Sequence, residues 1–135
     1  MKALTVRQPW AELIVRGQKD VENRSRRTTH RGQLAIHAGL RREASEPEVQ
    51  GQLDRGAIIG VVDVVGCVQG SRSPWAESGQ WHWLLANPRR LSKPILKRGA
   101  LGLWTVDPAT ERLIQRRLRE GETQPTAGRA RRGAG

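Results

Sequence analysis

The chain has 135 residues, a usual length for one domain and too short for two domains with separate hydrophobic cores. Its 24 Lys and Arg outnumber its 13 Asp and Glu, and the net charge of +11 favours a polyanionic partner such as a nucleic acid. The single cysteine excludes a fold held together by disulfide bonds. No apolar run is long enough for a signal peptide or a membrane-spanning helix, so we expect a cytoplasmic protein without membrane association.

Most of the basic residues are arginines, which bind phosphate groups through two parallel hydrogen bonds and stack on bases. A genome rich in G and C would also replace Lys by Arg, but that bias would not create a surplus of positive charge. We therefore favour contact with a nucleic acid or nucleotide over a basic surface that is only solvated.

The first predicted elements are a short strand at Ala3–Val6 and a helix that opens around Pro9. Proline is tolerated in the first turn because the N–H that it lacks would have no partner there. Three apolar residues then share one helical face: Trp10, Leu13 and Ile14. Gly17 is expected to end the helix.

Residues 19–24 are predicted to form a strand in which charged residues alternate with other types. One face of this strand would carry Lys19, Val21 and Asn23, and the other would carry Asp20, Glu22 and Arg24. A face with this much charge is not a simple core face, so the segment is a candidate for function.

Runs of apolar and β-branched residues predict four further strands: Gln33–Ala38, Ala57–Val68, Trp81–Leu85 and Ala100–Val106. In the second of these, Gly60 and Gly66 indicate a bend or bulge. Asn87 and Pro88 are expected to stop the third, with residues 91–94 as a connector.

Two polar segments separate these strands. Ser25–Arg31 is predicted to be a basic loop, and Arg41–Arg55, rich in acidic residues and Gln, is predicted to be a surface helix with a break near Pro47.

After the last strand, Asp107 is expected to cap a helix, with Pro108 next to it and Glu111–Arg119 forming its body. From Gly121 the composition turns to Gly, Ala, Thr, Pro and Arg without apolar periodicity. We therefore expect one domain over residues 1–120 and a disordered basic tail over residues 121–135.

Five or six short strands with helices between them, and no regular βαβ order, predict the α+β class. The architecture expected from this pattern is a partly closed mixed β-barrel with flanking helices.

The sequence lacks the common motifs for phosphate-binding loops, dinucleotide binding and zinc hydrolases, and it has no cysteine pair. Its three histidines lie in separate segments without the spacing of metal ligands: His30, His37 and His82. We therefore expect neither a metal nor a cofactor.

Three short patterns follow one another in the first forty residues: Q-P-W (8–10), G-x-K-x-x-E-x-R (17–24) and R-G-x-L-x-I-H-A (31–38). Each is weak alone, but the ordered set resembles an ASCH (activating signal cointegrator homology) domain, and the resemblance extends over residues 2–106. The later G-A-L-G-L-W (99–104) agrees with the way that family closes its barrel. The resemblance implies a PUA-like β-barrel with a cleft beside the first helix, lined by the second pattern.

The chemistry of that pattern suits a nucleotide. Lys19 can place a positive charge on a phosphate, Glu22 can accept hydrogen bonds from an exocyclic amine, and Arg24 can bind phosphate or stack on a base. The alternative is an ion-pair network that only joins the strand to the helix, but buried charges of this kind favour function. For Trp10 we favour packing in the core over stacking on a base, because its helical spacing places it with apolar residues.

The nucleic-acid or nucleotide site that we predict comprises Gln8, Trp10, Lys19, Glu22, Arg24, Ser25, Arg26, Arg31 and His37. Further phosphate contacts are expected from Arg27, Arg129, Arg131 and Arg132. His37 ends a strand and would lie at the rim of the cleft, although such histidines are more often only hydrogen-bonded. Trp75, which follows Pro74 in a loop, is the best candidate for an exposed stacking residue.

Enzymatic activity stays open. Some small bacterial relatives resemble amidohydrolases that deacylate modified cytidine and use the lysine of the motif and a threonine three positions later. Here the lysine is Lys19, but Glu22 occupies the place of the threonine. We therefore predict an RNA-binding protein, which we expect to be a monomer. The alternatives are a hydrolase acting on acylated nucleosides or RNA, with Lys19 and Glu22 as its polar groups, and a protein-interaction module whose basic tail binds an acidic partner.

Overall fold

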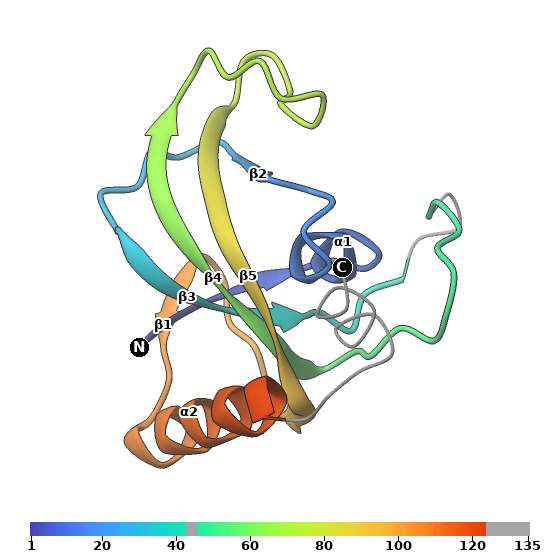
Figure 1. The fold of residues 1–135 in the computed structure, drawn as a ribbon. Coiled ribbons are helices and arrows are strands. Elements are labelled where there is room, and N and C mark those ends of the chain that lie inside the picture. The colour runs from blue at the N-terminus through green and yellow to red at the C-terminus, as the bar shows by residue number, and fades with distance from the viewer. Residues whose placement is uncertain (43–45, 124–135) are drawn as a thin grey trace, which may run out of the picture.

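The computed structural model describes residues 1–42 and 46–123, which form six strands and two helices (Figure 1). In chain order these elements are β1 (Lys2–Val6), α1 (Trp10–Val15), β2 (Val21–Arg24), β3 (Gly32–Ala38), β4 (Ala57–Val68), β5 (Trp81–Leu96), β6 (Leu103–Thr105) and α2 (Pro108–Thr123).

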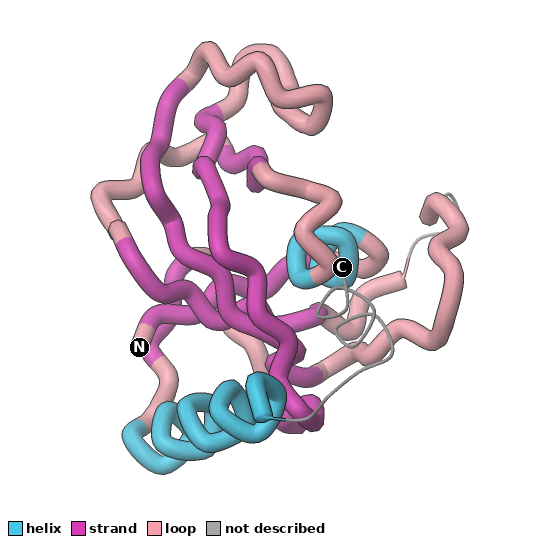
Figure 2. The backbone as a smooth tube through the Cα atoms, viewed as in Figure 1, coloured by secondary structure: helices cyan, strands magenta, loops and turns pink. Residues whose placement is uncertain are grey.

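All six strands belong to one sheet, in the order β2-β5-β4-β3-β1-β6. Strands β1 and β3 are parallel and the other neighbours are antiparallel, so the sheet is mixed. Figure 2 shows the strands curling round one another, with the two helices on different sides of them. The sheet is thus a curled half-barrel, and the prediction of an α+β, partly closed mixed barrel is confirmed.

Two groups of buried side chains fill the space between the sheet and its helices. The first includes Ala11, Ile14 and Val15 of α1, and the second includes Ile114 and Leu118 of α2. Neighbouring residues of β4 alternate between the groups: Ile59, Val62 and Val64 lie in the first, and Ile58 and Val61 in the second. This alternation lets β4 serve both cores, as expected for a strand covered on both faces.

The first helix begins at Trp10, directly after Pro9, as the sequence predicts. Of the predicted apolar face only Ile14 is buried; Trp10 and Leu13 are half-buried, and the helix buries Ala11, Glu12 and Val15 instead. Gly17 has φ +81°, a conformation that glycine adopts without steric cost, and it ends the helix as expected.

The prediction that Asn87 and Pro88 stop a strand is wrong, because β5 continues through them and through the predicted connector to Leu96. The pairing with β4 explains how. Val61 lies opposite Arg89 but Asp63 lies opposite Ala86, so the two residues sit in a bulge, where Asn87 has φ +51°. A proline in a bulge removes no hydrogen bond from the ladder.

The surface helix predicted for Arg41–Arg55 is also wrong for its described part, because residues 41–42 and 46–55 contain no helix. Side chains from the start of the chain bind backbone carbonyls of this segment instead. The Gln8 Nε2 donates to the Asp54 carbonyl at 2.8 Å, and an Arg16 Nη2 donates to the Gln50 carbonyl at 2.6 Å. These bonds hold an irregular path, and the segment has no apolar face to bury as a helix.

The C-terminal helix is longer than predicted, and the strand before it is shorter. Asp107 caps the helix by accepting a hydrogen bond from the Thr110 amide at 3.1 Å, as expected. The helix runs past Arg119 and through Gly121 to Thr123, so the first three residues of the predicted tail are helical. The rest of that tail, residues 124–135, lies outside the described residues.

Candidate nucleic-acid site

A cavity of about 430 Å³ opens between the end of β1, helix α1, strand β2 and the loop over residues 75–80; we call it the cleft. It brings together five of the predicted site residues: Trp10, Lys19, Glu22, Arg24 and Ser25. The cleft that the sequence resemblance implies beside the first helix is therefore present.

Three charged residues of the cleft form a network around the Glu22 carboxylate. Its Oε1 lies 3.7 Å from the Lys19 ammonium, and its Oε2 lies 2.7 Å from the Arg24 guanidinium. Arg24 also donates to the Thr5 carbonyl at 3.0 Å, which ties β2 to the end of β1. The predicted alternation separated Lys19 from the other two, but β2 begins only at Val21, so Lys19 lies in the preceding turn and is free to share their side.

Lys19 is the most sheltered charge of the network. Its side chain is 4% exposed, and its ammonium donates to the Val21 carbonyl and lies 5.5 Å from the centre of the Trp75 ring. Burial lowers the pKa of Lys19 below its ordinary value, and the Glu22 carboxylate is the main group that opposes this shift. A buried lysine with a lowered pKa in a cavity is a feature of functional sites.

Two indole rings border the cleft. Trp10 is half-buried: it packs against the core beside α1, as favoured, and also lines the cleft. Trp75 is half-buried as well, and its Nε1 donates to the Gln18 carbonyl at 2.8 Å. Each ring is thus held at the edge of the cleft by residues that do not line the cleft: Trp10 by the core and Trp75 by the Gln18 carbonyl.

The sequence did not indicate that the loop after Pro74 reaches this site. Asn23 holds it there, because its side chain donates to the Trp75 carbonyl and accepts from the Glu77 amide, each at 2.9 Å. Glu77 consequently adds a second carboxylate to the lining. The sequence showed only that Asn23 lies in a charged strand, and this does not reveal a hydrogen-bond partner more than fifty residues away.

Two other predicted residues lie outside the cleft. Gln8 is fully buried, where its Oε1 accepts a hydrogen bond from the Glu12 amide and its Nε2 binds the Asp54 carbonyl. Arg31 is exposed, and its guanidinium donates to the carbonyls of Thr28 and His30. Both residues organise backbone rather than line the cavity.

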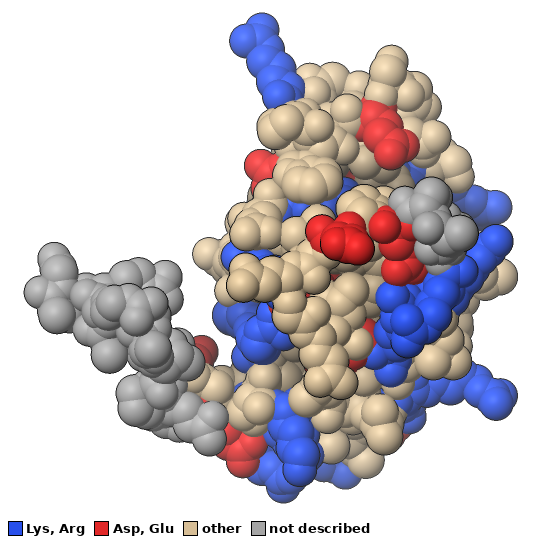
Figure 3. Space-filling model, turned by 90° about the vertical axis from the view of Figure 1, so that its right-hand side faces the viewer, with Lys and Arg blue, Asp and Glu red and all other residues tan. Residues whose placement is uncertain are grey.

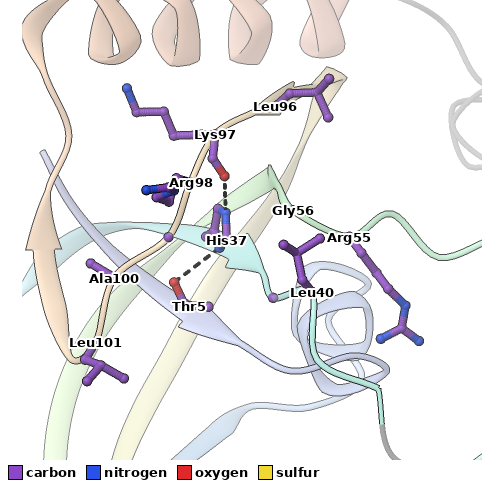
Figure 4. A pocket seen from close by; sticks show the side chains of 12 residues that line it. Thr5, His37, Leu40, Arg55, Gly56, Leu96, Lys97, Arg98, Ala100 and Leu101 are labelled. Carbon is purple, nitrogen blue, oxygen red and sulfur yellow. Dashed lines mark hydrogen bonds between the residues drawn. The ribbon is translucent and has the colours of Figure 1, made fainter.

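His37 is also away from the cleft, in the wall of a separate hollow of about 630 Å³ (Figure 4). Figure 4 shows its ring between Thr5 and the backbone of Lys97. The Nδ1 lies 3.2 Å from the Thr5 hydroxyl, and the Nε2 lies 2.6 Å from the Lys97 carbonyl. The imidazole is 2% exposed, so its role in the fold is that of a buried, hydrogen-bonded side chain.

The buried His37 predicts a loss of stability in acid. Burial lowers the pKa of its imidazole below 6.5, so the folded protein binds a proton less readily than the unfolded chain does. Its contribution to stability is therefore complete above about pH 6.5 and decreases as the pH falls below that value. Urea unfolding of the wild type and the His37→Asn variant at pH 7.5 and 5.0 would measure this, and we expect the smaller pH effect in the variant. Equal pH effects in the wild type and the variant would contradict the assignment.

Within the parts of the chain that the structure describes, no helix is both long and apolar enough to cross a membrane. The same residues include no cluster of three or more His, Cys, Asp or Glu that could hold a metal ion.

Comparison with known proteins agrees with this geometry. The ASCH domain family model matches residues 4–95. Activating signal cointegrator 1 from Homo sapiens is 31% identical and that from Mus musculus 40% identical, each over 77% of this chain. The chain spans only 22% of the length of these two relatives.

Solved structures of ASCH proteins from Zymomonas mobilis share the fold. A single-substitution mutant superposes with a TM-score of 0.61 at 18% identity, covering 84% of this chain and 96% of the other. A second structure gives a TM-score of 0.58 at 17% identity, covering 84% and 93%. Because the ASCH domain model matches more than half of its length, this chain belongs to the ASCH domain family.

Proposed function

We propose that the protein binds RNA, or another nucleic acid or nucleotide, with a base in the cleft and phosphates on the basic surface around it. The observation that carries this proposal is the joint placement of a sheltered Lys19–Glu22–Arg24 network and two indole rings around one open cavity. Membership of the ASCH family, which is associated with RNA binding, supports it.

The cleft offers the contacts that an unpaired base needs. Trp75 presents an aromatic surface, and stacking of one base on such a surface contributes about 1–3 kcal/mol. The Glu22 and Glu77 carboxylates can accept hydrogen bonds from exocyclic amines. Sequence-specific proteins contact RNA mainly in single-stranded regions, where bases can leave the stack, and a cavity of about 430 Å³ suits one such base.

The basic surface supplies the sequence-independent part of the binding. Lys and Arg cover much more of the face in Figure 3 than Asp and Glu do, and the chain carries a net charge of +11. Arginine contacts with phosphates release bound counterions, so the affinity should fall steeply as the salt concentration rises.

Fluorescence anisotropy with a labelled eight-nucleotide single-stranded RNA between 50 and 200 mM salt tests the proposal. We expect Trp75→Ala to weaken binding roughly tenfold or more at each salt concentration, because it removes a stacking surface. Arg112→Ala, an exposed residue of α2 outside the cleft, serves as the control and should alter mainly the salt dependence. Binding that ignores salt would rule out the phosphate contacts on the basic surface, and an equal loss in the two variants would rule out the cleft as the site.

A hydrolase acting on acylated nucleosides or RNA is the second candidate, and the buried Lys19 ammonium beside the Glu22 carboxylate in an open cleft favours it. Lys19 would stabilise a developing oxyanion and Glu22 would activate a water molecule. Two residues that line the cleft carry a hydroxyl group, Ser25 and Thr5. The Thr5 hydroxyl is already held by contacts with Trp104 and His37. Chromatography of RNA and acylated cytidines after incubation with the protein distinguishes the two functions, because a binding protein leaves both unchanged.

A further inference from the structure

A second hollow of about 450 Å³ adjoins the cleft and shares Arg24 and Ser25 with it; we call it the arginine hollow. Its lining includes the guanidinium-bearing residues Arg24, Arg26 and Arg27, and no carboxylate occurs among the described residues that line it. The cleft, by contrast, carries Glu22 and Glu77. Two cavities with shared lining residues therefore differ in charge: the charged residues of one have mixed signs, and those of the other are all positive.

The loop that forms this hollow is attached to the body of the domain. The indole Nε1 of Trp83, a buried residue of β5, donates to the Arg26 carbonyl at 3.0 Å. Thr28 is buried, and its hydroxyl accepts a hydrogen bond from the His30 amide at 3.1 Å. The backbone on both sides of Arg27 is thus held in place, and binding there requires less ordering of the loop.

The three arginines differ in their partners. Arg24 is held by Glu22 and the Thr5 carbonyl, but a guanidinium has five N–H groups, more than these contacts use. Arg26 and Arg27 are exposed, and neither side chain has a hydrogen-bond or ion-pair partner among the described residues. Unpaired arginines around a cavity suit an oxyanion with several acceptor atoms, since each guanidinium can bind two of its oxygens.

We propose that the arginine hollow is a phosphate subsite, which takes the phosphate of the nucleotide whose base occupies the cleft. This inference rests on the proposed function and adds the ligand class: a nucleoside phosphate or phosphodiester, in preference to a bare nucleoside. The difference in charge between the two cavities supports this proposal. A phosphate in the cleft would face two carboxylates, whereas a phosphate in the arginine hollow would face none among the described residues.

Titration calorimetry on the full chain with the four ribonucleosides, their 5′- and 3′-monophosphates and the matching dinucleotides tests the subsite. We expect the phosphate to raise the affinity for at least one base by about tenfold or more, as charge-assisted hydrogen bonds do. The Arg26→Ala/Arg27→Ala variant should lose this gain while it keeps the affinity for the bare nucleoside. The comparison of 5′- with 3′-monophosphates shows which phosphate position the arginine hollow binds. The dinucleotides show whether it also binds an internal phosphodiester.

The matched control is Arg112→Ala/Arg116→Ala, which removes the same charge from the exposed side of α2 and should preserve the phosphate gain. A nucleoside that binds without any gain from its phosphate would overturn the subsite and leave the proposed function intact. An equal loss of the gain in the two double variants would also overturn it, because long-range charge would then explain the effect. If no nucleoside, nucleotide or RNA binds, the proposed function itself fails.

Discussion

Replacing Glu22 by glutamine is expected to lower the free energy of unfolding by roughly 3 kcal/mol, as the loss of one partner in a buried ion pair does. The carboxylate is 10% exposed and lies between Lys19, which is 4% exposed, and the guanidinium of Arg24. Without its charge, Lys19 and Arg24 lose the carboxylate between them, and the Lys19 ammonium keeps the Val21 carbonyl, the Trp75 ring and the weaker attraction of Glu77 and Asp20. Urea unfolding of the variant and the wild type at pH 7 measures the difference.

Asp63→Asn is a matched control for this experiment. Its carboxylate also contacts an arginine, Arg89, at 2.6 Å, but both side chains are more than 20% exposed, so the loss should be about 1 kcal/mol or less. The Lys19→Met/Glu22→Gln variant should recover part of the stability, because the uncompensated ammonium is gone. If Glu22→Gln lowers the free energy of unfolding by no more than Asp63→Asn does, the network in the cleft is too well hydrated for the loss of one charge to destabilise the fold.

Short-range patterns predicted the elements whose partners lie nearby in the chain. Pro9 at the start of the first helix, the glycine at position 17 and the cap at Asp107 each describe one helix end. The continuation of β5 through Pro88 depends instead on its pairing with β4, more than twenty residues away. The irregular path of residues 46–55 likewise depends on bonds from Gln8 and Arg16, which no local pattern reveals.

The candidate site shows the same limit. The motif at residues 17–24 indicated Lys19, Glu22 and Arg24, and the structure brings these three around one cavity. Gln8 belongs to a neighbouring motif but is buried, which suggests that it stabilises the fold beneath the site. The loop with Trp75 was identified only as a place for an exposed aromatic residue, because its link to the cleft is made by a distant hydrogen bond from Asn23.

Helix α1 packs closely on the sheet at Gly60, and Gly60→Ala is expected to lower the free energy of unfolding by roughly 3 kcal/mol, the upper end for overpacking. A Cβ there would lie 2.6 Å from the Arg89 carbonyl oxygen and 2.8 and 2.9 Å from the two γ-carbons of Val15. The Val15 side chain can shift, but the carbonyl belongs to the backbone of β5 and cannot withdraw without disturbing the ladder. Urea unfolding of the purified variant measures the loss.

Gly70→Ala distinguishes this clash from a general effect of losing a glycine. Nothing lies within 4 Å of a Cβ at Gly70 and its φ is not positive, so the substitution should leave stability unchanged or raise it by up to about 1 kcal/mol through the unfolded state. Val15→Ala removes the side-chain clash but also two buried methyl groups, so Gly60→Ala should be compared with and without it; its cost should be smaller in the Val15→Ala background, but not zero, because the clash with the Arg89 carbonyl stays. A wild-type stability for Gly60→Ala alone would mean that β4 and β5 separate easily at this bulge.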